Sequence, residues 1–365
     1  MESISKFVEC LVPISQCNLK CSYCYVMQEN RRNSKTPPFC CSPEEIGYAF
    51  HRERWGGTLL VNLCAFGETL ASPIMPQIIY NILKQGHFIN VTNNGTMNNQ
   101  FDEIIKFPKD MLSRLCFAFS FHYVELKRTH NLQNFINNVK KVKAAGCSIL
   151  IQLNLADEYI PYLEDIKKIC VDNFGAYPQV ALTRKEGNEF SIFTSHTDEE
   201  YMALGQSFHS PLFEFTCKNF RIKRKEFCYA GDWSYKLDLA TGDLRSCYFS
   251  RPYYNIYKKP DEKIKALTVG SNCHKAYCVN SSHFMSLGVI PSVPCPSYID
   301  LRERADAKWY TDEMKAFLST RLYDTNKEYG ACKKIYSNFR FANYFIICRI
   351  MQAAKKIVKK IESLR

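Results

Sequence analysis

The sequence predicts an α/β fold built on a parallel sheet, and two observations carry that prediction. Short apolar runs typical of strands alternate with segments of helical periodicity through the first half of the chain. Such alternation favours parallel strands joined by right-handed helical crossovers. The runs are also nearly continuous in apolar residues, as expected when both faces of a strand are covered. The predicted strands are 7–14, 59–66, 88–92, 115–121, 148–155 and 179–183, and the predicted helices include 74–84, 132–145 and 161–173. The pattern alone leaves an open doubly wound sheet and a barrel as alternatives.

The first helix after the amino-terminal strand has a clear start signal. Ser42 is followed by Pro43, Glu44 and Glu45. Proline is favoured in the first helical turn, and acidic side chains there stabilise the positive end of the helix dipole. We therefore expect a helix to begin at this point.

Composition bounds the class of protein. The 365 residues suffice for one large domain and a smaller one. The chain has 18 cysteines, but its first residues form no apolar signal region and no stretch approaches the roughly 18 apolar residues of a membrane span. We expect a cytoplasmic chain with reduced cysteines.

The charge distribution argues against nucleic acid as a partner. The net charge is +12, but residues 333–365 hold nine Lys and Arg and one Glu, a surplus of eight, which leaves four for the rest. The body is therefore nearly balanced and does not predict a basic groove.

A cysteine motif follows the first predicted strand. It places Cys17, Cys21 and Cys24 within eight positions, and Tyr23 precedes the third cysteine. Three thiolates so closely spaced favour an iron–sulfur cluster over a catalytic thiol or a disulfide. The alternative is a zinc knuckle completed by Cys40 or Cys41.

This spacing, with an aromatic residue before the third cysteine, resembles the signature of the radical S-adenosylmethionine (radical SAM) enzymes. The resemblance implies a partial (β/α)6 barrel with a [4Fe-4S] cluster on Cys17, Cys21 and Cys24. It also implies that the fourth iron binds S-adenosylmethionine, which is cleaved reductively to a 5′-deoxyadenosyl radical that removes a hydrogen atom from the substrate. A low-potential electron donor such as flavodoxin or ferredoxin is the implied partner.

Cofactor contacts are expected where the barrel strands end. Gly67 and Glu68 match the last two positions of the family's Gly-Gly-Glu motif, whereas Phe66 departs at the first position. The segment 91–95 resembles the family's Thr-Asn-Gly signature, although an ordinary Asn-Gly turn is an equal alternative. Polar residues that alternate on later strands complete the set, and His122 has the alternatives of a substrate contact or a buried core histidine. The expected cofactor-binding residues are Tyr23, Gly67, Glu68, Thr92, Asn93, Asn94, Ser120, His122, Gln152, Asn154 and Arg184.

A second group of cysteines lies beyond residue 216. Cys228 and Cys247 flank a Thr-Gly turn between apolar alternating runs, which predicts a β-hairpin. The spacing of Cys228, Gly242 and Cys247 resembles the twitch half of the SPASM extension of radical SAM enzymes, which implies one auxiliary [4Fe-4S] cluster. The expected ligands are Cys228, Cys247, Cys273 and Cys278, with Cys295 and Cys217 in reserve. A structural Cys₄ zinc site is the alternative. Cys10, Cys64, Cys116, Cys147 and Cys170 are expected in the core.

These observations divide the chain. We expect a radical SAM partial barrel over 1–190, a connection over 191–215, a small α+β twitch-like auxiliary domain over 216–300, and a helical region over 301–365. The last segment has apolar residues at 346, 350 and 357 on one side and basic residues at 349, 355, 356, 359 and 360 on the other. Such a helix either packs on the body or contacts an anionic membrane surface.

The segment 278–291 resembles uncharacterised twitch-type proteins often encoded beside glycan genes. That resemblance favours a sugar, nucleotide sugar or other glycan precursor as the substrate, with net oxidation or rearrangement. The alternatives are a ribosomal peptide maturase that makes a crosslink or epimer and a non-catalytic zinc-binding scaffold. Peptide maturases commonly carry a leader-binding domain, whereas sixteen residues precede Cys17 here. No catalytic residue for the substrate half can be named from the sequence.

Overall fold

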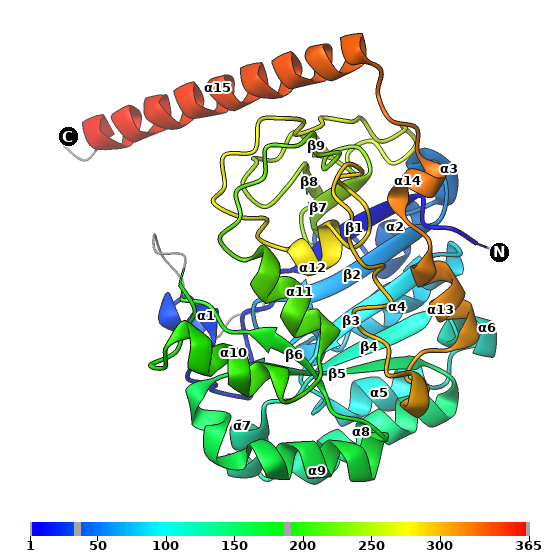
Figure 1. The fold of residues 1–365 in the computed structure, drawn as a ribbon. Coiled ribbons are helices and arrows are strands. Elements are labelled where there is room, and N and C mark those ends of the chain that lie inside the picture. Colours follow the sequence, from blue (N-terminus) through cyan, green and yellow to red (C-terminus); the bar gives the residue numbers. More distant parts are fainter. Residues whose placement is uncertain (1, 33–37, 186–190, 363–365) are drawn as a thin grey trace.

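A single mixed sheet organises the molecule (Figure 1). The computed structural model describes residues 2–32, 38–185 and 191–362. Its nine-stranded sheet has the order β6-β5-β4-β3-β2-β1-β7-β8-β9. The strands are β1 (Lys6–Val12), β2 (Leu59–Ala65), β3 (Phe88–Asn93), β4 (Leu115–Ser120), β5 (Ser148–Leu155), β6 (Gln179–Leu182), β7 (Ser234–Asp238), β8 (Asp243–Arg245) and β9 (Tyr254–Asn255).

Strands β1 to β6 are all parallel to their neighbours, which confirms the predicted α/β class. The sheet stays open beyond β6 and therefore forms a partial barrel. The helices of the barrel half are α1 (Tyr25–Gln28), α2 (Pro43–Ala49), α3 (Arg52–Trp55), α4 (Met75–Lys84), α5 (Asn98–Ile104), α6 (Lys109–Leu112), α7 (Tyr123–Arg128), α8 (Leu132–Ala145) and α9 (Leu163–Phe174), with 3-10 turns η1 (Thr69–Ala71) and η2 (Asp157–Tyr162). Those of the second half are α10 (Asp198–Gln206), α11 (Pro211–Asn219), α12 (Ser281–Phe284), α13 (Asp312–Ser319), α14 (Leu322–Thr325) and α15 (Ala331–Glu362), with η3 (Ala305–Ala307).

Several predicted boundaries are wrong by a few residues, and local chemistry explains them. The first strand ends at Val12 rather than Ile14, because Pro13 has no N–H to donate to a ladder. The helix predicted over 161–173 starts as a 3-10 turn and becomes α-helical only at Leu163. The start signal at Ser42 is confirmed, since its hydroxyl accepts from the Glu45 amide and the Glu45 carboxylate accepts from the Ser42 amide.

The residues after 300 close the amino ends of the parallel strands. The backbone of Trp309 accepts a bond from Ile149 at the start of β5, and the Phe317 ring of α13 stacks on Phe88 with centroids 3.7 Å apart. The Thr325 hydroxyl donates to the carbonyl of Ile4 at 2.6 Å. With that end closed, the carboxyl ends of the strands are where the barrel opens.

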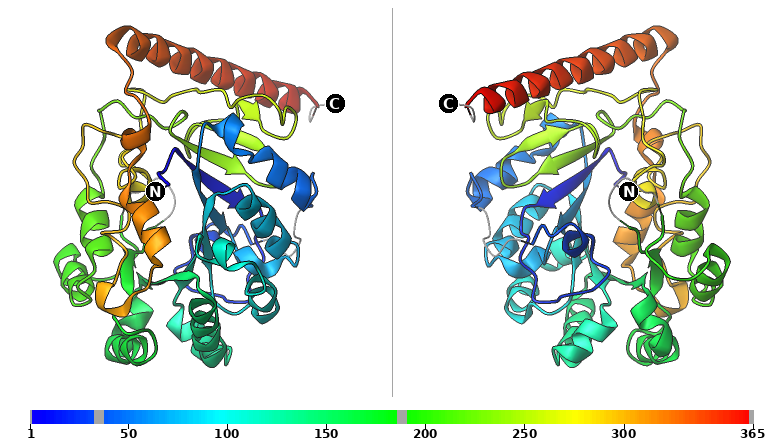
Figure 2. Two further views of the ribbon diagram at one scale, coloured as in Figure 1. Left: turned by 90° about the vertical axis from the view of Figure 1, so that its right-hand side faces the viewer. Right: turned by 90° about the vertical axis from the view of Figure 1, so that its left-hand side faces the viewer.

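The second half extends the sheet beyond β1. Strand β7 lies parallel to β1, and β8 returns antiparallel to β7 through the turn that contains Gly242, so the hairpin predicted between Cys228 and Cys247 is confirmed. The loops from 220 to 300 and helix α11 face the concave side of the barrel sheet, opposite α4, α5 and α8 (Figures 1 and 2).

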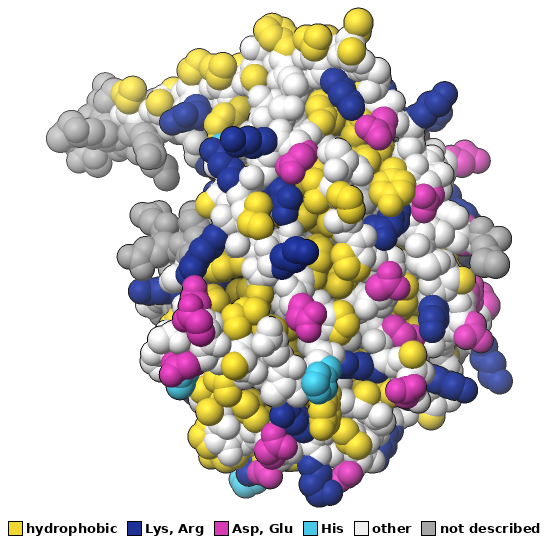
Figure 3. Space-filling view, in the orientation of Figure 1, with side chains coloured by type: hydrophobic (Ala, Val, Ile, Leu, Met, Phe, Trp, Pro, Cys, Tyr) yellow, Lys and Arg dark blue, Asp and Glu magenta, His cyan; other side chains and the backbone are white. Residues whose placement is uncertain are grey.

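Helix α15 runs along the outside of the molecule beside the loops of the second half (Figures 1 and 2). It packs through Phe341, which is 1% exposed, and through Tyr344, whose hydroxyl donates to the Pro252 carbonyl at 3.2 Å. Its other side carries exposed apolar side chains: Ile335, Tyr336, Phe339, Ile346, Ile347, Ile350, Met351 and Ile357. Figure 3 shows hydrophobic side chains along this helix. The packing expected of a terminal helix thus uses residues other than 346, 350 and 357, which point outward; the basic side chains at 355, 356, 359 and 360 lie outside the described side chains. No helix in the described part of the chain is long and apolar enough to cross a membrane.

Candidate functional site

The cysteine motif forms a loop at the carboxyl end of β1. Just before Cys17, the amides of Gly67 and Glu68 donate to the carbonyls of Ile14 and Gln16, each at 2.7 Å. A Cβ atom on Gly67 would lie 2.0 Å from the Gln16 carbonyl oxygen, so only glycine permits this approach. The end of β2 therefore fixes where the loop begins.

Acidic and amide side chains from neighbouring strands hold the loop in place. The Glu125 carboxylate of α7 accepts from the Lys20 amide at 2.5 Å and is itself held by Arg128. Arg128 is the main cause that lowers the Glu125 pKa. On the other side, the Asn94 amide group lies 3.7 Å from the Cys17 sulfur. The loop is thus clamped from both β3 and α7.

Tyr23, the aromatic residue before the third cysteine, takes part in a hydrogen-bond network. Tyr23 is 6% exposed, and its hydroxyl lies 2.5 Å from His122 Nδ1 and 2.7 Å from the Tyr159 hydroxyl. Burial lowers the His122 pKa to about 4, so the imidazole is neutral at pH 7. His122 is therefore placed beside the cysteine loop, and one of its nitrogens is already engaged by Tyr23.

The cysteine loop opens onto a cavity of about 340 Å³, called here the cofactor cavity. The three motif cysteines line it, and Cys17 and Cys24 are close enough to Cys21 to be among the causes that raise its pKa, behind burial. Most of the expected cofactor-binding residues line the same cavity: Tyr23, Gly67, Thr92, Ser120, His122, Gln152, Asn154 and Arg184. The structure therefore brings together residues from β2 through β6 that the sequence singled out separately.

Glu68, Asn93 and Asn94 are the expected cofactor-binding residues that do not line this cavity. Both Glu68 oxygens accept backbone bonds, from Leu70 at 2.9 Å and from Asn94 at 2.7 Å. Burial raises the Glu68 pKa to about 7, although these two bonds oppose the shift. The carboxylate thus joins the ends of β2 and β3 and supports the site from behind.

The second set of cysteines also converges. Cys228, Cys247, Cys273 and Cys278 all line a small pocket of about 40 Å³. Burial raises the pKa of Cys228, and the three other sulfurs add to the shift. Cys217 and Cys295, held in reserve as ligands, do not line this pocket.

The donor sets fit iron–sulfur clusters in type and number, with three thiolates at one site and four at the other. Among the described residues, no three Cys, His, Asp or Glu side chains are grouped closely enough to hold one metal ion. Ligands of a cluster each bind a different iron and need not surround one ion. Cys40 and Cys41, the candidates for completing a zinc knuckle, line neither pocket, and their sulfurs lie 3.7 Å apart.

A further cavity of about 320 Å³, called here the central cavity, adjoins the cofactor cavity. Both are lined by Tyr25, Cys64, Thr92, Ser120, Gln152, Leu182 and Arg184. Cys278 lines the central cavity as well as the small pocket, so the central cavity lies between the two cysteine sites.

The lining of the central cavity corrects the prediction for one cysteine and includes three residues that the sequence analysis did not single out. Cys64, expected to be plain core, faces both cavities; Cys10, Cys116, Cys147 and Cys170 are buried as expected. The missed residues are Glu9, Asn62 and Asn90, which pair in register across β1, β2 and β3. A carboxylate or amide side chain near the middle of each of three largely apolar strands is the signal that would have found them.

Comparisons with known proteins found solved structures with similar folds. No family model matches the sequence, and no curated protein does. The solved structures that it resembles include the radical SAM enzymes SuiB, anSMEcpe and BtrN. SuiB from Streptococcus suis matches with a TM-score of 0.48 and 12% identity over 70% of this chain and 64% of that chain. Native anSMEcpe with bound AdoMet and Kp18Cys peptide matches with a TM-score of 0.49 and 12% identity over 96% of this chain and 99% of that chain. BtrN in complex with AdoMet and 2-DOIA matches with a TM-score of 0.35 and 11% identity over 77% and 94%.

The chain spans less than two thirds of the length of the SuiB structure. All three of these TM-scores are below 0.5.

Proposed function

We propose that this chain is a radical SAM enzyme with one auxiliary iron–sulfur cluster. The observation that supports it best is the cofactor cavity, which joins the three motif cysteines to polar residues at the ends of β3 to β6. Three thiolates leave one iron of a four-iron cluster without a protein ligand, and the adjoining cavity provides room for a ligand of that iron.

The lining side chains suggest separate roles. Cys17, Cys21 and Cys24 would hold the cluster, and Arg184 would bind the carboxylate of S-adenosylmethionine, because a guanidinium pairs well with a carboxylate. Thr92 and Ser120 present hydroxyl groups that match the ribose. Three further polar residues of the lining, His122, Gln152 and Asn154, would orient the cofactor and limit access of water.

The chemistry itself belongs to the cofactors. When bound, a reduced four-iron cluster would supply one electron to S-adenosylmethionine, yielding methionine and a 5′-deoxyadenosyl radical able to remove a hydrogen atom from an unactivated carbon. The protein would hold the substrate in the central cavity, which adjoins the cofactor cavity and is walled by Cys278. Cys228, Cys247, Cys273 and Cys278 would hold an auxiliary cluster placed to accept an electron in a net oxidation. Flavodoxin or ferredoxin would be the external electron donor.

The test combines metal counting with product detection in anaerobically reconstituted protein. We expect about eight irons per chain for two four-iron clusters, and 5′-deoxyadenosine after addition of dithionite and S-adenosylmethionine. About four irons with product would remove the auxiliary cluster from the proposal. Zinc in place of iron, without product, would contradict the enzyme and support a scaffold.

Helix α15 supports a second, separate proposal of membrane contact. Its outward apolar side chains are 54 to 70% exposed, and the segment 333–365 is strongly basic. An amphipathic basic helix binds anionic membrane surfaces through both properties. We expect full-length protein to sediment with anionic vesicles and the double variant Ile346→Asn, Ile350→Asn to lose that binding. Ile222→Asn, which changes an exposed apolar residue elsewhere, is the matched control. Equal sedimentation of all three proteins would contradict the proposal.

A further inference from the structure

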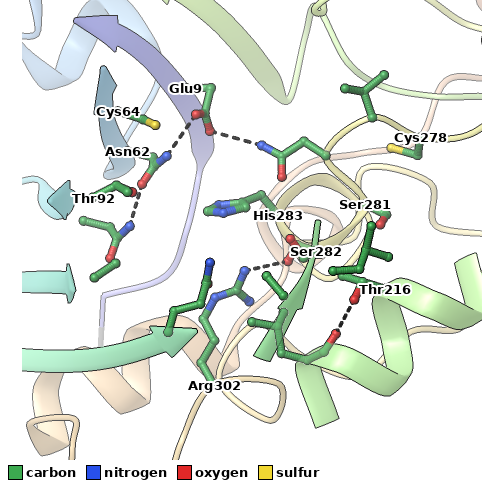
Figure 4. A pocket seen from close by; sticks show the side chains of 18 of the residues that line it. Glu9, Asn62, Cys64, Thr92, Thr216, Cys278, Ser281, Ser282, His283 and Arg302 are labelled. Atoms are coloured by element: carbon green, nitrogen blue, oxygen red, sulfur yellow. Dashed lines mark hydrogen bonds between the residues drawn. The ribbon is translucent and has the colours of Figure 1, made fainter. Parts of the chain in front are cut away.

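Three neighbouring strands line one wall of the central cavity with carboxylate and amide side chains (Figure 4). Asn90 of β3 donates to the Asn62 carbonyl oxygen at 2.5 Å, and Asn62 of β2 donates to Glu9 Oε1 at 3.0 Å. Asn280 approaches from the second half of the chain and donates to Glu9 Oε2 at 3.4 Å. Because these bonds fix the orientation of each group, the wall presents a preorganised set of acceptors and donors.

Glu9 is the acidic member of this wall. It is 6% exposed, and it lies opposite Lys236 in the register of β1 and β7. Burial raises its pKa to about 7, while the bond from Asn62 and the charge of Lys236 oppose that shift. Its oxygens receive amide bonds from Asn62 and Asn280, and the Tyr248 hydroxyl is a further partner. A carboxylate can accept about four hydrogen bonds, so Glu9 still has a lone pair for a hydroxyl or amine of a ligand.

A buried cation lines the same cavity. Arg302 is 2% exposed, and its guanidinium donates to the carbonyls of Tyr298 at 3.2 Å and Ser282 at 3.0 Å. It also lies 3.6 Å from the Tyr298 ring centroid. All of these partners are neutral, so the contacts of Arg302 in the described chain leave its charge without a counter-ion.

The balance of charge favours an anion. Among the side chains that line the cavity, Glu9 is the carboxylate, Arg184 and Arg302 are the guanidinium groups, and His283 is the imidazole. Burial and the charge of Arg302 lower the His283 pKa, so this imidazole is neutral at pH 7. Arg302 therefore brings into the cavity a positive charge that its own neutral contacts do not balance. If Arg184 binds the cofactor carboxylate, the charge of Arg302 remains for the substrate.

We propose that the central cavity binds a compact polyhydroxylated substrate with one anionic group, such as a sugar phosphate, with the anion at Arg302 and a hydroxyl group at Glu9. This assignment rests on the proposed function and deepens it by naming the substrate class and two residues that recognise it. A cavity of about 320 Å³ with fixed polar groups suits one small polar molecule.

The test measures equilibrium binding to full-length, cluster-reconstituted protein by anaerobic calorimetry. The probes are inorganic phosphate, glucose and glucose 1-phosphate. The variants are Arg302→Met, Arg302→Lys and Glu9→Gln. The matched control is Arg304→Met, because Arg304 also donates to backbone carbonyls, those of His209, Phe208 and Pro178, but does not line the cavity. Cooperative thermal unfolding is required of each protein.

We expect glucose 1-phosphate to bind more tightly than either phosphate or glucose. Arg302→Met should weaken phosphate and glucose 1-phosphate about tenfold or more, Arg302→Lys should restore part of the loss, and Glu9→Gln should weaken the two glucose-containing probes but not phosphate. Unchanged phosphate binding in Arg302→Met, an equal loss in Arg304→Met, or no binding to the unmodified protein would overturn the proposal. Phosphate binding with no gain from the sugar would overturn the substrate class and point to an acidic peptide.

Cleavage of S-adenosylmethionine without substrate is measured on the same preparations. If the unmodified protein does not cleave S-adenosylmethionine, the proposed function is contradicted. The binding measurements do not depend on cleavage and test the ligand assignment separately. The two failures are therefore distinguishable.

Discussion

The two cysteine sites differ in how they are held and in what they leave open. The first has three cysteines on a loop at a cavity of about 340 Å³, held directly by the Glu125 carboxylate and supported from behind by the Glu68 carboxylate, which accepts from the Asn94 amide. The second has four cysteines around a pocket of about 40 Å³. Two of its cysteines are held by backbone and hydroxyl bonds, since Cys228 and Gly270 exchange backbone bonds and the Ser250 hydroxyl accepts from the Cys247 amide at 3.0 Å.

Under the proposed function, this difference would let the same kind of metal group serve two roles in one chain. A site with a missing ligand and an adjoining cavity can bind a reactant, whereas four ligands in a tight pocket saturate the metal group. The carboxylates of Glu68 and Glu125 titrate, so the hydrogen bonds that support the first site depend on pH, whereas the backbone and hydroxyl bonds at Cys228 and Cys247 involve no titrating group. The following changes test that contrast.

The largest effect is expected from Gly67→Ala. The added Cβ would lie 2.0 Å from the Gln16 carbonyl oxygen, and backbone atoms cannot rotate away. We expect a loss of about 3 kcal/mol in unfolding free energy and loss of 5′-deoxyadenosine formation, with the absorbance of the second cluster retained. Gly330→Ala is the control, because nothing lies within 4 Å of a Cβ there. Normal cleavage in Gly67→Ala would show that this approach does not position the loop.

The next effect is a pH dependence at Glu68. Burial raises its pKa from 4.5 to about 7 in the folded state. The contribution of Glu68 to the unfolding free energy is therefore fully present below pH 4.5 and is lost as the pH rises through 7. The unfolding free energy of the unmodified protein should fall by about 3 kcal/mol between pH 4.5 and 8 relative to Glu68→Gln. Urea titrations across this range measure it. Parallel pH profiles for the two proteins would remove Glu68 as the titrating clamp.

Glu125→Gln should act on the first site alone. The change weakens the bond to the Lys20 amide and removes the ion pair with Arg128. We expect iron to leave the first cluster about tenfold faster in the presence of a chelator. Glu164→Gln breaks a similarly spaced pair with Lys167 on α9 and serves as the control. Equal rates in the two variants would indicate that Glu125 does not hold the loop.

The smallest effect is expected from Ser250→Ala at the second site. Loss of the cap on the Cys247 amide should cost about 1 kcal/mol and make the second cluster more labile to the chelator. Formation of 5′-deoxyadenosine should continue at its original rate. A fall in that rate would mean that the two sites are coupled.

The architecture was predictable because it depends on local signals. Apolar runs located β1 to β6, and a Thr-Gly turn located the hairpin between Cys228 and Cys247. The motif cysteines and the strand-end residues could be singled out from the sequence as candidates, because their spacing is short or they fall where strands end. Only the structure shows that most of these residues line the same cavity.

The remaining features depend on register and on distant contacts. The wall of Glu9, Asn62 and Asn90 arises only when three strands pair in register. Arg302 enters the same cavity from a segment almost 300 positions away from Glu9, which no local pattern reveals. Glu68 matched a motif position, yet its carboxylate turns toward backbone amides that belong to two loops.

The most direct test changes one cysteine site at a time. Replacing Cys17, Cys21 and Cys24 together by Ala should abolish 5′-deoxyadenosine formation and leave about four irons, with the absorbance of the second cluster. Replacing Cys228, Cys247, Cys273 and Cys278 should also leave about four irons, with cleavage of S-adenosylmethionine retained. Cleavage that persists in the triple variant would contradict the account.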